Sequence, residues 1–370
     1  MTSEIILRAD GVSKTFLSRT NLLKAPRPIH AVSAVNLEIR HGETFAIVGE
    51  SGCGKSTLSR LLLDLIALSE GRVVFEGEDV AALKGGAKRA FRRQAQMIFQ
   101  DPFSSLNPRM TVADIIGEPI WLEGRLSRTE RRNKVLDLMA RVGLRADQAD
   151  LYPHEFSGGQ RQRIGIARAL AGDPKLIIGD EPVSALDVSV QAQIINLLED
   201  LKHEFGLTMI IVAHDLVVVR HMSDRVAVMY LGQIVEIGPV EDLYGEPLHP
   251  YTQSLMAAVP VSSPAGRHAR QAAEGDLPDA ASVPSGCSFH PRCPFARDRC
   301  LTEAPHLRDV GNGHQAACHF HAEIRQSRPK AAAEAAVPPK LEQRLQLYRA
   351  RQALNPSRTE TETQKYPIKQ

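Results

Sequence analysis

The residues of this chain most able to do chemistry form a glycine-rich run that ends in a lysine and two hydroxyl side chains. Residues 49–57 fit the pattern G-x-x-x-x-G-K-[ST], in which backbone N–H groups wrap phosphate oxygens, the lysine reaches the outer phosphates and a hydroxyl ligates Mg²⁺. The run consists of Gly49, Glu50, Ser51, Gly52, Cys53, Gly54, Lys55, Ser56 and Thr57. It predicts a site for the phosphates of a nucleoside triphosphate and its magnesium ion; the alternative is a plain glycine-rich turn.

The segments on either side of this run suit that interpretation. Residues 44–48 are apolar and short enough for a buried parallel strand, and residues 57–68 are leucine-rich without proline or glycine. The sequence therefore predicts a strand, a loop and a helix in succession. The helix N-terminus adds unpaired N–H donors and a partial positive charge, so that glycines of the loop mark close approach to phosphate.

A second set of chemical groups follows an apolar segment at residues 175–179. Asp180 and Glu181 come directly after it, at the carboxyl end of an expected strand, where ligands of parallel sheets collect. Asp180 is expected to hold Mg²⁺ through water. Glu181 is expected to orient and deprotonate the attacking water, the task of a general base. The alternative is a strand that ends in two solvated acids.

Residues 156–163, Phe-Ser-Gly-Gly-Gln-Arg-Gln-Arg, resemble the signature motif of the ATP-binding cassette (ABC) ATPases. The resemblance implies an α/β fold: a P-loop NTPase core with a parallel sheet, an antiparallel β subdomain and a helical subdomain. It also implies that the signature of one subunit closes over the ATP held by the other. Its residues here are Ser157, Gly158, Gly159 and Gln160. A helix expected from about residue 160 to 171 would make them a second anion site.

The same resemblance gives roles to isolated residues that are weak signals when taken singly. Gln100 resembles the glutamine that contacts Mg²⁺ and the water, and His214 the histidine that contacts the outer phosphate and Glu181. Ser184 and Asp187 resemble the loop at the dimer seam, and Phe16 takes the place of the aromatic that stacks on adenine. Gly179 stands at a position where many members of the family have alanine. Both residues are small, so no loss of function is expected.

Composition restricts where the chain works and what it binds. Lys and Arg number 45 against 43 Asp and Glu, a net charge of +2, which gives no strong field for nucleic acid or an anionic membrane. No stretch of about 18 uninterrupted apolar residues is present, and the start has neither a basic region nor a cleavage site of a secretory signal. The resemblance then implies a peripheral subunit on the cytoplasmic face of the cell membrane.

The chain divides into three expected parts. Residues 1–240 are predicted to be the nucleotide-binding domain, with strands near residues 5–7, 34–39 and 72–75 in its antiparallel sheet. The pattern turns helical from about residue 91 to 160, and residues 131–142 carry an apolar face with helical spacing. Trp121 lies in this part, as an anchor for a membrane partner or as a core residue. Residues 241–325 form an expected extension, and residues 326–370 an expected disordered tail with a brief helix at 341–354.

Residues 249–253, His-Pro-Tyr-Thr-Gln, resemble a hallmark of the ATPases of oligopeptide, dipeptide and nickel importers. The resemblance implies ATP hydrolysis that energises peptide uptake. It also implies three kinds of partner: a second ABC ATPase subunit, two transmembrane permeases and, indirectly, a substrate-binding protein. The alternatives are nickel or glutathione import, and a soluble ABC ATPase that acts as a clamp on DNA or ribosomes. A drug exporter lacks support from this segment.

Four of the five cysteines fall close together in the extension: Cys287, Cys293, Cys300 and Cys318. In a cytosolic chain such a set is more typical of metal ligands than of disulfides. The peptide-transporter branch includes members with a [4Fe-4S] cluster on a similar set, and four thiolates suit that cluster. Zinc and unliganded thiols stay open as alternatives, because four sulfurs also suit zinc and histidines lie nearby.

Overall fold

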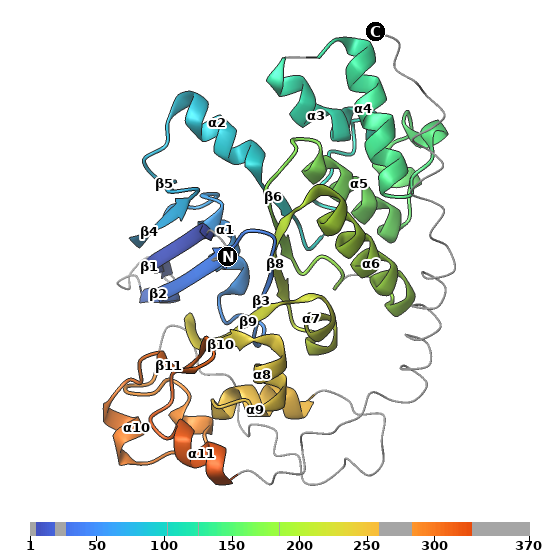
Figure 1. Cartoon of the computed structure of the whole chain (residues 1–370). Coiled ribbons are helices and arrows are strands. Elements are labelled where there is room, and N and C mark those ends of the chain that lie inside the picture. Colours follow the sequence, from blue (N-terminus) through green and yellow to red (C-terminus); the bar gives the residue numbers. More distant parts are fainter. Residues whose placement is uncertain are drawn as a thin grey trace.

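The computed structural model describes residues 5–18, 27–101, 103–124, 126–184, 186–258 and 283–327. The predicted tail lies outside these ranges from residue 328 onward, and so does its brief helix at residues 341–354. Within them the chain builds two sheets, with helices packed around the larger one (Figure 1).

The larger sheet contains the strand that precedes the glycine-rich run. In spatial order its strands are β11 (Arg308–Gly311), β12 (His314–Ala316), β10 (Gln233–Pro239), β9 (Arg225–Tyr230), β3 (Thr44–Val48), β8 (Thr208–Ala213), β7 (Leu176–Asp180) and β6 (Ala95–Ile98). The strands from β9 to β6 are parallel, whereas β10, β12 and β11 add on by antiparallel pairing. The carboxyl ends of β3, β7, β8 and β6 therefore meet at one edge of the sheet.

Strand β3 is buried on both faces, as its continuous apolar sequence predicts. Ala46 and Val48 belong to one core cluster with the helices, while Phe45 and Ile47 belong to a second cluster with the smaller sheet. The helices of the first cluster include α6 (Val188–Phe205) and α7 (Leu216–Met222), which carry the chain from β7 to β8 and from β8 to β9. The sheet is thus rigidly supported where the site forms.

The smaller sheet is antiparallel and confirms the three short strands predicted near the N-terminus. Its order is β2 (Arg27–Arg40), β1 (Ile5–Ser18), β4 (Glu70–Phe75) and β5 (Glu78–Asp79). Helix α1 (Lys55–Leu62) lies between this sheet and the larger one, and its buried leucines Leu58, Leu61 and Leu62 join the second core cluster. The glycine-rich run therefore lies at the junction of the two sheets.

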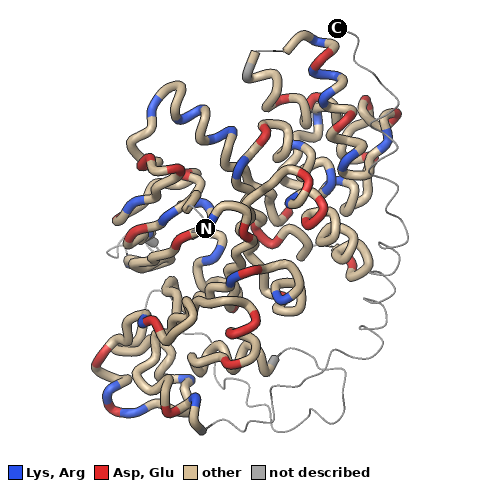
Figure 2. Tube along the Cα trace, viewed as in Figure 1, with Lys and Arg blue, Asp and Glu red and all other residues tan. Residues whose placement is uncertain are grey.

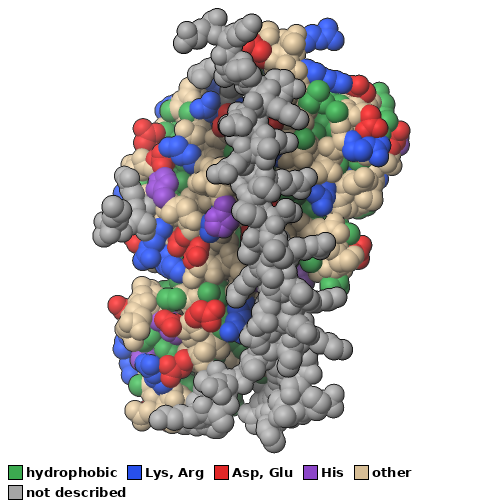
Figure 3. Space-filling model, turned by 45° about the vertical axis from the view of Figure 1, so that its right-hand side comes forward, with side chains coloured by type: hydrophobic (Ala, Val, Ile, Leu, Met, Phe, Trp, Pro, Cys, Tyr) green, Lys and Arg blue, Asp and Glu red, His purple; other side chains and the backbone are tan. Residues whose placement is uncertain are grey.

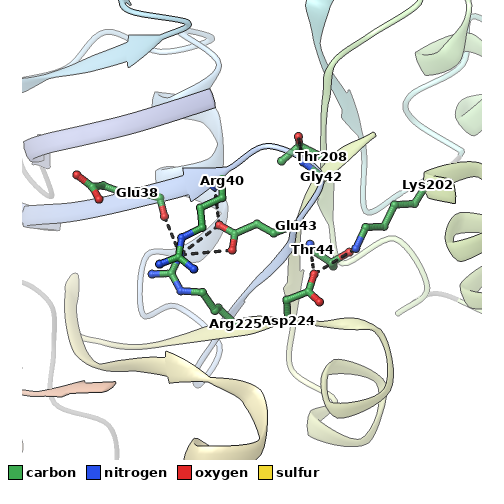
Figure 4. Close-up of polar contacts among 9 residues, drawn as sticks. All are labelled: Glu38, Arg40, Gly42, Glu43, Thr44, Lys202, Thr208, Asp224 and Arg225. Carbon is green, nitrogen blue, oxygen red and sulfur yellow. Dashed lines mark hydrogen bonds and ion pairs between the residues drawn. The ribbon is translucent and has the colours of Figure 1, made fainter. Parts of the chain in front are cut away.

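Polar contacts join the two sheets at the amino ends of the parallel strands (Figure 4). Arg225 donates to the carbonyl of Glu38 at 3.0 Å and to the carboxylate of Glu43, which is 8% exposed, at 3.2 Å. Asp224 accepts from the Thr44 amide at 2.7 Å and from Lys202 at 3.2 Å. These contacts lie at the edge opposite the glycine-rich run, so they hold the framework and leave the other edge free for chemistry.

The helix after the glycine-rich run is shorter than predicted. The expected helix reached residue 68, but α1 ends at Leu62. Asp64 takes a left-handed φ of 51°, and the amides of Asp64 and Leu65 bond back to the carbonyls of Leu61 and Arg60 at 3.0 and 2.9 Å. This Schellman motif ends a helix although the following residues favour it, because Asp tolerates the left-handed conformation.

The helical pattern predicted from about residue 91 begins in α2 (Gly85–Gln94) and is interrupted by strand β6. It continues in α3 (Val112–Glu123), α4 (Arg128–Arg141) and α5 (Gly158–Leu170), which pack together beside the sheet (Figure 1). The predicted face of residues 131–142 is confirmed, because Val135, Leu138 and Met139 are buried in α4. Trp121 is 63% exposed, so the core role considered for it is wrong.

The part after residue 239 packs against the outer strands of the larger sheet. It contains α8 (Val240–Gly245), α9 (Pro250–Ala258), α10 (Asp298–Thr302), α11 (His321–Ser327) and the strands β11 and β12. Glu236 of β10 is fully buried and fixes this part: it accepts from the amides of Leu248 and His249 at 2.8 and 2.9 Å, and pairs with His314 at 2.8 Å. The segment 283–327 is thereby joined to the core (Figure 1).

Charge is spread over the described surface. Acidic and basic stretches are scattered over all parts of the described chain trace, with a basic group on α2 (Figure 2). The face in Figure 3 mixes both signs with apolar and polar side chains. Among the described residues, no helix combines the length and the apolar character that a membrane span requires.

Candidate active site

The glycine-rich run forms a tight loop between β3 and α1, and two of its glycines are required by close packing. Gly49 has φ of 155°, and a side chain there would meet the Met229 carbonyl oxygen at 2.2 Å. Gly54 has φ of 107°, and a side chain there would meet the Ala31 carbonyl oxygen at the same distance. The loop is therefore wedged between β9 and β2, and its backbone is held for close contact with a ligand.

Lys55 begins α1 and is 4% exposed. Its ammonium group donates to the carbonyl oxygens of Gly49 and Glu50 at 2.8 and 2.9 Å. The N-cap of α1 is Gly54, which has no side chain, so the first N–H groups of the helix are not capped by it. A buried cation and a helix N-terminus at one loop form a strong anion site.

Asp180 ends β7 beside this loop, as predicted. It is 3% exposed and accepts a hydrogen bond from the Ser56 hydroxyl at 2.8 Å. Burial raises the pKa of Asp180, and the hydrogen bond from Ser56 opposes that change. A hydroxyl and a carboxylate side by side are oxygen ligands of the kind that Mg²⁺ uses together with substrate phosphates.

Glu181 connects two of the other predicted residues. Its carboxylate oxygen Oε2 accepts from Gln100 at 2.9 Å and lies 3.3 Å from Nδ1 of His214. Gln100 follows β6 and His214 follows β8, so three strand ends contribute to the cluster. Glu181 also has a φ of 46°, a rare conformation for a residue other than glycine, and its amide donates to the Val212 carbonyl at 3.0 Å. Backbone strain of this kind concentrates at functional sites.

The signature residues lie at the start of α5. Ser157 is the N-cap of α5 and forms a capping box with Gln160, so these hydrogen bonds stay within its own helix. Gly158 and Gly159 form the first turn, and a side chain on Gly159 would meet Val190 of α6 at 2.5 Å. The predicted helix is confirmed, although it begins two residues earlier than residue 160.

The other two predicted positions lie on separate elements. The Ser184 hydroxyl donates to the Glu181 carbonyl at 3.1 Å, while Asp187 is the N-cap of α6 and accepts from the Val190 amide at 3.0 Å. Asp187 thus lies near the signature helix through Val190. Phe16 is on β1, 41% exposed, with the Lys14 ammonium 5.2 Å from its ring. An exposed ring on the smaller sheet is open to stacking.

Sequence reasoning missed two contacts of the loop with the C-terminal part. The Tyr251 hydroxyl accepts from the Glu50 amide at 2.8 Å, and the sequence offered only a family resemblance for the segment that contains Tyr251. Both guanidinium Nη atoms of Arg292 donate to the Glu50 carboxylate at 3.0 Å. Both partners follow Glu50 by more than 200 residues, and no spacing in the sequence marks the pairs.

All four clustered cysteines line one small cavity, together with apolar and histidine side chains of α9, α11 and the connecting turns. No disulfide joins these four described residues. Burial raises the pKa of Cys293 to about 11 and of Cys318 to about 12, and the neighbouring cysteines add to both changes. Over the described ranges, no three or more His, Cys, Asp or Glu side chains form a group that could hold a metal ion.

The fold defines a nucleotide hydrolase of the ABC ATPase class, together with the geometry of the glycine-rich loop, the two acids after β7 and the signature residues. Comparisons with known proteins agree. The sequence model of a family described as "ABC transporter" matches residues 32–184, and a second, "Oligopeptide/dipeptide transporter, C-terminal region", matches residues 235–300. The first contains the loop, Gln100, the signature and Asp180–Glu181, and the second contains Tyr251, Arg292 and three of the four cysteines.

Two curated relatives resemble almost the whole chain. A probable peptide ABC transporter ATP-binding protein of Sinorhizobium fredii is 50% identical over 91% of this chain and 96% of its own length. The oligopeptide transport ATP-binding protein AppF of Bacillus subtilis is 49% identical over 86% of this chain and 98% of its own. The chain therefore belongs to the family of ABC transporter ATP-binding proteins.

Solved structures support the same fold. The dimeric ATP-binding cassette MJ0796, in a post-hydrolysis state with ADP and phosphate, has a TM-score of 0.57 and 31% identity, and covers 63% of this chain and 98% of its own. The structure of cbiO1 from Clostridium perfringens, part of an ABC transporter complex, has a TM-score of 0.57 and 29% identity, with coverages of 66% and 92%. The predicted fold class is confirmed.

Proposed function

We propose that this chain binds and hydrolyses MgATP to drive peptide uptake through a membrane transporter. The contact of Ser56 with Asp180 beside Lys55 is the single observation that carries the proposal. The loop from Gly49 to Thr57 wraps the phosphates, Lys55 neutralises the outer ones, and Phe16 stacks on the adenine. Ser56, Asp180 and Gln100 supply the magnesium site; Mg²⁺ is commonly held by one or two protein groups with phosphates and water, so a larger cage is not required.

In the hydrolytic step, Glu181 takes a proton from the water that attacks the outer phosphorus. Its contacts with Gln100 and His214 fix its carboxylate, so the base has one orientation. His214, 60% exposed on its side chain, is free to contact the outer phosphate as well. The products are ADP and inorganic phosphate.

The second half of the site comes from a facing ATPase subunit. Ser157, Gly158, Gly159 and Gln160 open α5, a helix of 13 residues whose N-terminus attracts anions. Ser184 and Asp187 lie at the seam between subunits. The facing chain is a related subunit or a second copy, and binding of ATP brings the two together.

The membrane partners are two permease subunits, with a substrate-binding protein acting through them. Trp121 and Leu122 are 63% and 72% exposed at the end of α3, and we assign this surface to a permease contact. The chain would then be peripheral, on the cytoplasmic face of the membrane. Peptides are preferred over nickel or glutathione as cargo, because the two relatives above are described as peptide and oligopeptide transport proteins and the C-terminal match has the same description.

We divide the chain into a nucleotide-binding domain at residues 1–240, with its helical subdomain near 90–160, and an extension at 241–325. For this extension we propose a [4Fe-4S] cluster on Cys287, Cys293, Cys300 and Cys318. Four thiols that line one small cavity, with Cys300 buried and the other three partly buried, support it, because their charged forms would need a compensating cation there. Each of the four cysteines would supply one thiolate to such a cluster, and zinc on the same four sulfurs is the alternative.

The test is peptide uptake by membrane vesicles that contain this chain, its ATPase partner and the two permeases encoded beside its gene. Labelled peptide should enter the vesicles only when ATP is supplied on the side of the membrane where this chain is bound. Labelled nickel or glutathione should not enter under the same conditions. Glu181→Gln should lower phosphate release by about 10²- to 10⁴-fold. ATP-driven entry of nickel or glutathione but not of peptide would contradict the assignment of peptide as the cargo. Rapid ATP turnover in Glu181→Gln would show that Glu181 is not the general base.

A further inference from the structure

We propose that Arg292 and Tyr251 are positioning residues for the phosphate loop, so that the C-terminal part sets the affinity for ATP. This inference rests on the proposed function of the loop. Its basis is Glu50, the second residue of the loop, which is held at three of its groups by three different side chains.

Two of these side chains come from the C-terminal part. Arg292 binds both carboxylate oxygens of Glu50 at 3.0 Å, and Tyr251 accepts from its amide at 2.8 Å. The third, Lys55, donates to the Glu50 carbonyl at 2.9 Å and so links this arrangement to the lysine expected to meet the phosphates. A bidentate guanidinium–carboxylate pair fixes direction as well as distance, which suits a role in orienting a loop.

Arg292 itself is well fixed. Its side chain is 9% exposed, and its guanidinium lies 5.8 Å from the ring centre of Phe289 and 6.0 Å from that of Tyr230. These rings and Tyr251 form one buried aromatic cluster between β9, α9 and the turn at 290–292, with centroids 4.6 to 5.4 Å apart. Since the Glu50 side chain is 30% exposed and that of Arg292 only 9%, the arginine is the more firmly packed partner, and we infer that it determines where the loop residue lies.

The consequence concerns the strength of nucleotide binding rather than the chemical step. Neither Arg292 nor Tyr251 contacts Asp180, Glu181 or His214 through any hydrogen bond or ion pair found in the described residues. Loss of the contacts of Arg292 and Tyr251 with Glu50 should leave the loop with more conformations. The free energy needed to order the loop then reduces the free energy of ATP binding. We therefore expect a weaker Kd and a raised KM with a nearly unchanged kcat.

The experiment uses the full chain and measures ATP affinity by fluorescent-nucleotide titration, steady-state hydrolysis, and hydrogen exchange of the loop amides. Arg292→Ala should raise Kd and KM about ten-fold, the size expected for loss of a charged bidentate contact, and should speed exchange in residues 49–54. Arg292→Lys should lie between, since it keeps the charge but not the two parallel bonds. Tyr251→Phe keeps the ring packing and should raise Kd by a smaller factor.

The matched control is Arg299→Ala, which removes an arginine from the same part of the chain; Arg299 lies in α10 and pairs at 2.7 Å with Glu303, the C-cap of that helix. It should bind ATP as the parent does. In a double-mutant cycle, Arg292→Ala should add little to Glu50→Gln, because both act on one contact.

Parental Kd, KM and loop exchange in folded Arg292→Lys and Tyr251→Phe would overturn the proposal, as would equal effects of Arg292→Ala and Arg299→Ala. If Arg292→Ala does not fold, the lysine and phenylalanine variants decide the matter. The proposed function fails separately: it fails when the unchanged chain itself does not bind ATP.

Discussion

The nucleotide core and the C-terminal part of this chain carry their chemistry in different ways. In the core, four polar side chains of the site, those of Gln100, Asp180, Glu181 and His214, lie at or just after the ends of buried parallel strands, which bring them to one edge. In the C-terminal part, short helices and turns surround a cavity, and the decisive contacts reach back to a loop more than 200 residues earlier. A site on a regular framework of strands can therefore be predicted from short sequence patterns, whereas the contacts of the irregular part are found only in the three-dimensional structure.

Substitutions in the nucleotide core should weaken ATP binding more than substitutions in the C-terminal part, and the largest effect is expected at Lys55. Lys55→Ala removes a buried cation from the phosphate loop, and we expect the Kd for ATP to rise by about 100-fold or more, in line with the energy of hydrogen bonds to charged groups. The measurement is nucleotide titration of the full chain. Lys134→Ala, which removes a surface partner of Asp173, serves as the control and should not change the Kd.

The two serine caps test whether the signature does more than stabilise its helix. Ser157 caps α5 and Ser127 caps α4, each in a capping box. Either serine replaced by alanine should lower the free energy of unfolding by about 1 kcal/mol, measured by urea denaturation. Only Ser157→Ala should also lower ATP turnover, by about ten-fold, because the proposed function gives its hydroxyl a contact with the nucleotide of the facing chain. Equal turnover in both variants would leave Ser157 with a capping role alone.

The cysteines give the smallest expected effect on hydrolysis and the clearest chemical readout. Anaerobically purified chain should contain about four irons and absorb in the visible range, as four-cysteine clusters do. Changing Cys287, Cys293, Cys300 or Cys318 to serine should remove iron, with only a few-fold rise in KM through the neighbouring Arg292. Cys53→Ser, in the phosphate loop, should retain iron. A colourless anaerobic product that contains zinc would contradict the cluster.

Much of the nucleotide core could be predicted from the sequence, because its signals are local. The loop, the strand before it and the acids after residue 179 each follow from short patterns that the structure reproduces. The end of α1 could not be predicted, since it depends on a left-handed Asp64 in a sequence that still favours helix. The support of Glu50 could not be predicted either: it depends on a tertiary fold that places Tyr251 and Arg292 beside a loop they do not adjoin in sequence.

In the proposed function two chains enclose one triphosphate, and each gives a different half of the site. Its most direct test is the mass in solution of Glu181→Gln, with its ATPase partner or alone, measured by light scattering with and without MgATP. Because this variant should bind ATP without cutting it, we predict that MgATP converts monomers to dimers, and that Ser157→Ala in the same background weakens the dimer. A chain that binds MgATP and stays monomeric with every related partner would contradict the account.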